Sequence, residues 1–163
     1  MLHSNVSKQL GFTLVESLIV VGIIGILMAM AIPSFIAAQN RAKLNQATEM
    51  VVASLQQSQR EAVRRNQSCS VTLDKNADKI AGQQGCLLSG DVVLPEAIDL
   101  DYTGASGDIQ YGIRGNTTTN KSIFLKVKNN LTNGRCLTVS APLGIIRLGT
   151  YDASNGSCRK LGG

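Results

Sequence analysis

The feature that most constrains this chain is an uncharged run of 22 residues, Ser17–Ala38, close to its N-terminus. A helix of that length spans about 33 Å, which is enough to cross a bilayer core of about 30 Å. Pro33 interrupts the run, and membrane helices tolerate proline at a kink. The sequence therefore predicts a membrane-spanning helix that is kinked near Pro33.

Two interpretations of this run compete. In the first, it is a secretory signal that is cleaved after the small-residue site Ala29-Met30-Ala31. In the second, it is a retained membrane helix. The run is longer than the usual signal core of about 7–15 residues, and Glu16 stands where a signal sequence has basic or apolar residues. Both observations favour the retained helix.

Glu16 is the residue at the entrance of the run that most needs an explanation. A carboxylate at the centre of a membrane helix costs about 2.5 kcal/mol or more, so a retained one is expected to have a function and a partner. The alternative places Glu16 at the membrane interface, where its carboxylate reaches water. Its position in the sequence leaves both alternatives open.

The helical pattern continues beyond the apolar run. Apolar and small residues recur at intervals of three and four residues and form one narrow stripe, while the other faces are polar. The stripe consists of Leu44, Ala47, Val51, Leu55, Ser58 and Ala62. We therefore expect one continuous helix over about residues 12–65, whose second half packs against the rest of the chain.

From Cys69 onward the sequence has short apolar runs separated by turn residues, as in antiparallel sheet. Strands are predicted at 70–73, 86–88, 108–113, 122–127, 135–140 and 143–148. Asn133-Gly134 predicts a tight turn between two of them. The expected fold class is α+β, with an antiparallel β-sheet packed on the second half of the long N-terminal helix.

The four cysteines are Cys69, Cys86, Cys136 and Cys158. They contain no Cys-x-x-Cys pair, and an even number in an exported chain favours disulfides. Three pairings are possible. We favour Cys69–Cys86 and Cys136–Cys158, because each pair falls within one local group of strands and turns.

Charge is distributed unevenly along the chain. Residues 66–109 carry two lysines against seven acidic residues, a net charge of −5, whereas residues 110–163 carry eight basic residues against one aspartate, a net charge of +7. The basic C-terminal third is either an ordinary solvated face or a surface for an anionic partner.

The residues needed for several kinds of catalysis are missing from the sequence. Its one histidine is His3, and it has neither a phosphate-binding loop nor a dinucleotide fingerprint. Histidine-dependent catalysis and histidine-ligated metal are therefore not expected in a chain that is cut after Gly11. We expect no enzyme activity, no cofactor and no metal site.

The stretch GFTLVESLIVVGIIGILMAMAIPSF, from Gly11 to Phe35, resembles the class III signal of the type IV pilin superfamily. The resemblance implies that a prepilin peptidase cuts between Gly11 and Phe12 and that the new N-terminal Phe12 is methylated. It also implies an assembly role for Glu16, whose partner would be the N-terminal amine of Phe12 in a neighbouring subunit. In a dry core such a pair is far less costly than an unpaired acid.

The stretch GRCLTVSAPLGIIRLG is similar to the minor pilins and pseudopilins of the GspH/FimT group. Some members of that group bind DNA through a Gly-Arg-x-Arg element, and Gly144-Ile145-Ile146-Arg147 keeps its glycine and its last arginine. The resemblance therefore implies candidate residues for non-specific DNA binding, with nearby cations adding charge against phosphates. These candidates are Arg135, Arg147, Arg159 and Lys160.

Together these observations predict a leader at 1–11, a transmembrane and filament-core helix half at 12–38, and a periplasmic or extracellular globular domain at 39–163. The expected function is that of a minor pilin in a type IV pilus, with DNA uptake during natural transformation (competence) as an added activity. The alternative is a minor pseudopilin of a type II secretion system, with protein partners only.

The resemblance also implies the partners and the location of the chain. The partners are other pilin subunits, the prepilin peptidase, the inner-membrane assembly platform and the inner membrane itself. Before assembly the chain would cross the bacterial inner membrane once, with its N-terminus in the cytoplasm, in agreement with Lys8 on that side. After assembly it would lie in a cell-surface pilus.

Overall fold

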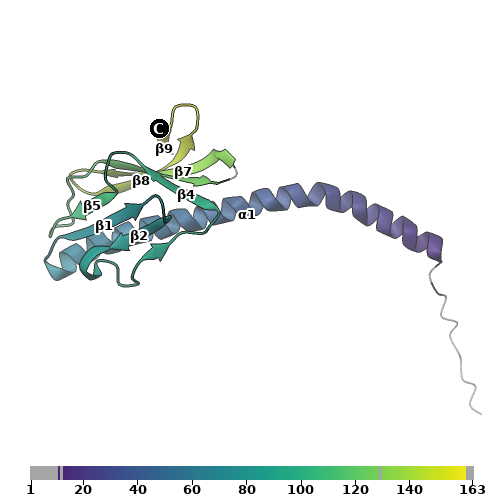
Figure 1. The fold of residues 1–163 in the computed structure, drawn as a ribbon, viewed down its shortest axis with the longest axis horizontal. Coiled ribbons are helices and arrows are strands. Elements are labelled where there is room, and N and C mark those ends of the chain that lie inside the picture. Colours follow the sequence, from purple (N-terminus) through teal and green to yellow (C-terminus); the bar gives the residue numbers. More distant parts are fainter. Residues whose placement is uncertain (1–10, 12, 129, 161–163) are drawn as a thin grey trace, which may run out of the picture. The chain divides into compact units, whose positions relative to one another are not determined.

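The computed structural model describes residues 11, 13–128 and 130–160, without the side chains of 84, 130–133 and 160. The chain divides into two compact units, residues 1–39 and 40–163, which are described one at a time. The long helix α1 (Leu14–Arg65) contributes to both (Figure 1). The predicted helix is confirmed over these residues, whereas Phe12 lies outside the described part of the chain.

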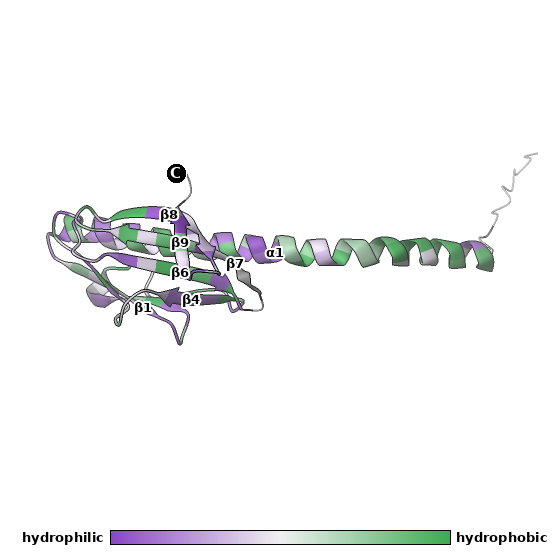
Figure 2. Ribbon diagram, turned by 90° about the horizontal axis from the view of Figure 1, so that it is seen from above, coloured by the Kyte–Doolittle hydropathy of each residue, from purple (hydrophilic) through white to green (hydrophobic). Residues whose placement is uncertain are grey.

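The first unit consists of the N-terminal half of α1. Thr13 caps the helix, because its Oγ1 accepts a hydrogen bond of 3.3 Å from the backbone N–H of Glu16. Pro33 lies inside α1 without ending it, and the hydroxyl of Ser34 donates to the carbonyl of Ala31 at 2.8 Å. In Figure 2 this half of the helix is coloured mostly as hydrophobic.

The second unit combines the C-terminal half of α1 with two antiparallel sheets. A four-stranded sheet has the order β3-β2-β1-β5, and a five-stranded sheet has the order β4-β6-β7-β8-β9. The strands are β1 (Cys69–Asp74), β2 (Lys79–Gly82), β3 (Val92–Val93), β4 (Ile98–Tyr102), β5 (Asp108–Tyr111), β6 (Lys121–Val127), β7 (Asn130–Ser140), β8 (Ile145–Asp152) and β9 (Ser157–Lys160). The α+β prediction is confirmed.

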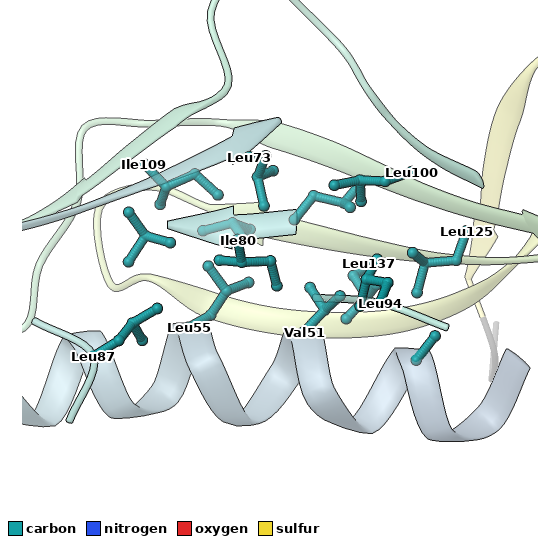
Figure 3. Packing of buried hydrophobic residues seen from close by; sticks show 14 of the residues in the cluster. Val51, Leu55, Leu73, Ile80, Leu87, Leu94, Leu100, Ile109, Leu125 and Leu137 are labelled. Carbon is teal, nitrogen blue, oxygen red and sulfur yellow. The ribbon is translucent and has the colours of Figure 1, made fainter. Parts of the chain in front are cut away.

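The core lies between the C-terminal half of α1 and the strands (Figure 3). All six residues of the predicted stripe are buried. Val51 and Leu55 belong to one cluster with apolar residues of both sheets, among them Ile80 and Leu137. Glu61 is also buried, although its polar side chain suggested a solvated face. The prediction that this half of the helix packs against the sheets is confirmed.

Two local predictions are wrong. Residues 86–88 do not form a strand, because β1 pairs instead with β2, so that Leu73 lies opposite Ile80. The predicted turn at Asn133-Gly134 lies inside β7, where Gly134 pairs with Lys126. The hairpin of β6 and β7 does exist, but Val127 pairs with Asn130, so the chain reverses earlier than predicted.

Both favoured disulfides are present in the structure. Cys69 is joined to Cys86 with their Cα atoms 5.5 Å apart, and Cys136 is joined to Cys158 with their Cα atoms 5.6 Å apart. The second bond links β7 to β9 across the intervening strand β8. Gly149 of β8 makes this possible, because a Cβ at that position would lie 2.9 Å from each sulfur. The edge strand is thereby attached covalently to the sheet.

Candidate functional site

The N-terminal candidates lie at the start of α1. Gly11 and Thr13 are exposed, and Glu16 occupies the first turn of the helix. An acid in the first turn also interacts favourably with the positive end of the helix dipole. Phe12 and the leader residues 1–10 lie outside the described residues. The structure therefore places Glu16 on exposed helix, three residues after the capping threonine.

The helix surface that follows Glu16 is apolar and has no partner within its own unit. Each residue from Leu14 to Gln39 is exposed. Leu14 is 76% exposed and Met30 is 73% exposed, which is extreme for large apolar side chains in a folded protein. By length and composition α1 can cross a membrane. A lipid bilayer or other apolar helices would remove this surface from water.

The candidate DNA-binding residues lie on three neighbouring strands, but they do not share one face of the sheet. Arg135 of β7 pairs with Thr150 of β8, which in turn pairs with Arg159 of β9. Directly paired residues point to the same face, and successive residues in a strand alternate between faces. Arg135 and Arg159 therefore share one face, whereas Arg147, three residues before Thr150, lies on the other.

Lys160 pairs with Gly149, so its backbone position belongs to the face of Arg147. Its side chain lies outside the described residues. The nearby Tyr151 contacts the ring of Phe124 at a centroid distance of 5.4 Å, and the Lys126 ammonium lies 4.9 Å from the Tyr151 ring centroid. The Tyr151 ring is therefore already in contact with Phe124 and Lys126.

The turn before Arg147 has a structural purpose that sequence reasoning missed. Gly144 has a φ of +66°, and a Cβ there would lie 3.0 Å from both the Gln59 amide nitrogen and the Tyr111 ring. The Gln59 Nε2 donates hydrogen bonds to the carbonyls of Gly115 at 2.7 Å and Leu143 at 3.3 Å. The glycine of the Gly-x-x-Arg element thus allows the turn to pack against α1.

A second cluster of cations lies at the C-terminal end of α1. Glu61 accepts hydrogen bonds from Arg64 at 2.7 Å and from Arg65 at 2.9 Å. Hydrogen bonds from Arg64 hold the pKa of Glu61 below its ordinary value, against the opposing effect of burial, and Arg65 adds to the lowering. The Arg60 side chain, one turn before Arg64, forms no ion pair with a described residue. The four-residue spacing of Arg60 and Arg64 is the sequence signal that could have indicated this cluster.

Within residues 11, 13–128 and 130–160, no group of three or more His, Cys, Asp and Glu side chains is placed to hold a metal ion. Asp101 lies 2.6 Å from the Lys75 ammonium and 3.4 Å from that of Lys126. These contacts tie the end of β4 to its surroundings.

Residues 6–32 match the family described as the prokaryotic N-terminal methylation motif. A search of curated proteins found no significant match. Two crystal structures of the type IV minor pilin FimU from Pseudomonas aeruginosa resemble the fold, each with a TM-score of 0.51. They are 21% and 20% identical in sequence, and the matches cover 68% and 70% of this chain and 94% and 92% of FimU.

The minor pseudopilin EpsH of the type 2 secretion system of Vibrio cholerae matches with a TM-score of 0.47 and 15% identity, over 67% of this chain and 94% of EpsH. The methylation motif and the FimU fold occur here in the expected order along one chain. The chain therefore has a prokaryotic N-terminal methylation motif at residues 6–32, and its globular unit has a fold similar to that of the minor pilin FimU.

Proposed function

We propose that this chain is a minor pilin that is assembled into a type IV pilus through the N-terminal half of α1. The observation that carries the proposal is the methylation motif at 6–32 joined to a helix whose residues 14–39 are all exposed. A prepilin peptidase releases the leader between Gly11 and Phe12, and Phe12 is then methylated. Until assembly, the apolar half of α1 anchors the chain once in the inner membrane, with its N-terminus in the cytoplasm.

On extraction by the assembly platform, the apolar half of α1 exchanges lipid for the helices of other pilin subunits. Glu16 then pairs with the N-terminal amine of Phe12 in a neighbouring subunit. An acid and an amine that leave water together are much less costly than either one alone. Pro33 provides the place at which this half of the helix adjusts to its neighbours.

The test is the recovery of this chain in pili sheared from the cell surface. Glu16→Ala should remove the chain from the sheared fraction, whereas Glu49→Ala, an exposed acid on the other half of α1, should not. Both variants should be present in the membrane fraction with their disulfides formed. Incorporation of Glu16→Ala at the wild-type level would contradict the pairing.

Sheared pili, together with a deletion of this chain, also test the alternative, a pseudopilin of a type II secretion system. A pilus subunit is present in sheared pili, and its deletion leaves the release of exported enzymes unchanged. A pseudopilin gives the opposite result: absence from pili and loss of that release.

A second candidate function is non-specific DNA binding by the cations of β7, β8 and β9. The observation in its favour is that Arg147 and Arg159 are both exposed near one edge of the five-stranded sheet, although on opposite faces, in a C-terminal third with a net charge of +7. Phosphate contacts need only such cations, and the affinity then falls steeply as salt rises. Stacking on Tyr151 is not required.

The test of DNA binding is the triple variant Arg147→Glu, Arg159→Glu and Lys160→Glu in the full chain, reconstituted in nanodiscs. A matched double variant, Arg41→Glu and Lys43→Glu, changes exposed cations on α1 instead. The triple variant should no longer retain duplex DNA. The matched variant should retain DNA like the wild type, with binding that weakens as the salt concentration rises. Unchanged retention in the triple variant would rule out this surface.

A further inference from the structure

An open groove lies at the C-terminal end of α1, within the globular unit, with a volume of about 400 Å³. It is formed by one face of the helix and the loop that follows β5. The residues that line it are Gln59, Arg60, Val63, Arg64, Arg114 and Gly115. Three of these six residues are arginines and none is acidic, so the groove is strongly positive. Its apolar wall is Val63, whose side chain is 52% exposed.

The loop is fixed against the helix, which gives the groove a defined form. The Gln59 side chain donates to the Gly115 carbonyl at 2.7 Å, and the Gly115 backbone N–H donates to the Gly112 carbonyl at 2.8 Å. Gly115 has a φ of +73°, and a Cβ there would lie 3.3 Å from Gln59 and 3.4 Å from Val63. The close approach brings Arg114 to the same groove as Arg60 and Arg64, although it is about fifty residues away in sequence.

The positive charge of the groove is only partly compensated within the described residues. Arg64 pairs with Glu61 but keeps 63% of its side chain exposed. Arg60 and Arg114 are both exposed, and neither forms a hydrogen bond or ion pair with another described residue. Like charges four residues apart on a helix repel each other. An anionic partner would remove that repulsion and use the bidentate donors of the guanidinium groups.

The opposite end of the five-stranded sheet carries exposed acid. Lys121 pairs with Val139 at one end of β6, next to the turn that contains Gly144 and contacts Gln59. Val127 is at the other end of β6, where it pairs with Ile98, and Glu96 and Asp99 flank that residue. Seven residues of strand span about 20 Å, so the two charged regions are well separated.

Glu96 is exposed and Asp99 is half-buried, and neither side chain forms a hydrogen bond or ion pair with another described residue. Both interact electrostatically with Lys128, whose ammonium lies 2.8 Å from Asp78. The region near the start of β4 therefore has more acid than base, whereas the end of α1 has more arginine than acid. Two copies in the same orientation can join the acidic region of one to the groove of the next. A contact of this head-to-tail kind continues into a filament when its rotation does not close a ring.

We propose that the groove formed by Arg60, Arg64 and Arg114 binds the acidic segment around Glu96 and Asp99 of a second copy of this chain. The inference deepens the proposed role as a filament subunit, and it rests on that role. Arg60 and Arg114 hold the carboxylates, while Val63 contacts the partly exposed Ala97 between them. A nucleic acid is a poorer occupant, because the lining contains no aromatic side chain for base stacking.

The test uses the full chain in lipid nanodiscs and a fluorescent peptide with the sequence of residues 95–101, Pro-Glu-Ala-Ile-Asp-Leu-Asp. Fluorescence anisotropy should show saturable binding. The double variant Arg60→Glu and Arg114→Glu should weaken it at least tenfold, whereas Arg41→Glu and Lys43→Glu should have little effect. The same double variant should bind a peptide in which lysine replaces the three acids.

The proposal is overturned if the wild-type chain shows no saturable binding of the peptide, or if the double variant binds the peptide as well as the wild type does. It is also overturned if the double variant loses binding of a 12-base-pair DNA duplex but keeps binding of the peptide. If charge reversal prevents disulfide formation, Arg60→Gln and Arg114→Gln replace it and should still weaken peptide binding. The recovery of Glu16 variants in sheared pili decides the proposed function separately. A failure of the groove is thus distinguishable from a failure of the filament role.

Discussion

The two halves of α1 form one continuous helix, but they are built for different surroundings. From Leu14 to Gln39 every residue is exposed within this chain, whereas one stripe from Leu44 to Ala62 is buried against the sheets. The first half is apolar on all faces and the second on only one. A helix that is apolar all round needs partners on all sides. Among the described residues, such partners contact the second half and leave the first half exposed.

The largest expected difference between the halves comes from truncating one leucine in each. Leu55 is fully buried and Leu27 is 63% exposed. Leu55→Ala should lower the free energy of unfolding of the globular unit by about 2–5 kcal/mol, because it leaves a cavity. Leu27→Ala should change that free energy by less than about 0.5 kcal/mol.

The measurement is urea unfolding of the full chain in detergent, followed by near-ultraviolet circular dichroism. All three tyrosines, Tyr102, Tyr111 and Tyr151, lie in the globular unit, so the tyrosine part of the signal reports on that unit. Equal losses for the two alanine variants would contradict the division of α1 into an internally packed half and an externally packed half.

A second comparison uses glycines. A Cβ on Gly149 would lie 2.9 Å from both sulfurs of the Cys136–Cys158 bond and 2.5 Å from the Arg159 carbonyl oxygen, whereas nothing lies within 4 Å of a Cβ on Gly25. Gly149→Ala should therefore destabilise the globular unit by about 1–3 kcal/mol. Gly25→Ala should leave its unfolding unchanged. The same unfolding curve, with free thiols counted by alkylation and mass spectrometry, checks both.

Glu61 allows a test by pH in the second half of the helix. Its pKa is lowered in the folded chain, so the ion pairs with Arg64 and Arg65 stabilise the fold above the ordinary pKa of the carboxyl group. That stabilisation is lost as the pH falls through the lowered pKa. Glu61→Gln should therefore reduce the melting temperature at pH 7 and have progressively less effect on acidification.

The matched control for this variant is Glu49→Gln, because Glu49 is exposed on the same helix and forms no hydrogen bond or ion pair with another described residue. Glu49→Gln should change the melting temperature little, both at pH 7 and at acidic pH. If the melting temperatures of Glu61→Gln and the wild type differ by the same amount from pH 7 through the acidic range, the ion-pair account is contradicted.

The smallest expected effect concerns Tyr111, which is fully buried at the point where β5 meets the turn that contains Gly144. Its hydroxyl has no hydrogen-bond partner among the described residues, and burial raises the pKa of Tyr111 to about 12. Tyr111→Phe removes an unsatisfied polar group and keeps the ring. The variant should be more stable by about 1 kcal/mol in the same urea titration. A loss of stability would show that the hydroxyl has a partner.

Much of the fold could be predicted because its signals are local. The spacing of Leu44, Val51 and Leu55 defined the buried face of α1, and apolar runs located β1, β5, β6 and parts of β7 and β8. β9 was missed because Ser157–Lys160 is short and polar, and its pairing with β8 makes it a strand. β4 was missed although Ile98, Leu100 and Tyr102 alternate with aspartates.

The candidate sites divide in the same way. The Gly11-Phe12 junction and Glu16 lie within six residues of sequence, so a single motif was sufficient to propose them. The relative faces of Arg135 and Arg147 depend on the register between β7 and β8, in which Ser140 pairs with Ile145, and no local pattern in the sequence shows that register. The groove at Arg60 depends on Arg114, which folding brings from a distant loop. No pattern in the sequence connects these two arginines.

The measurement that tests the central claim most directly is the mass of the mature N-terminal peptide, from chain purified from the cell that produces it. The claim is that the exposed apolar half of α1 is retained for assembly and that the chain is cut before this half, between Gly11 and Phe12. The prediction is a chain that begins at methylated Phe12. A mature chain that begins at Ile32, after Ala29-Met30-Ala31, would show that the apolar half is a discarded secretory signal, and it would contradict the account.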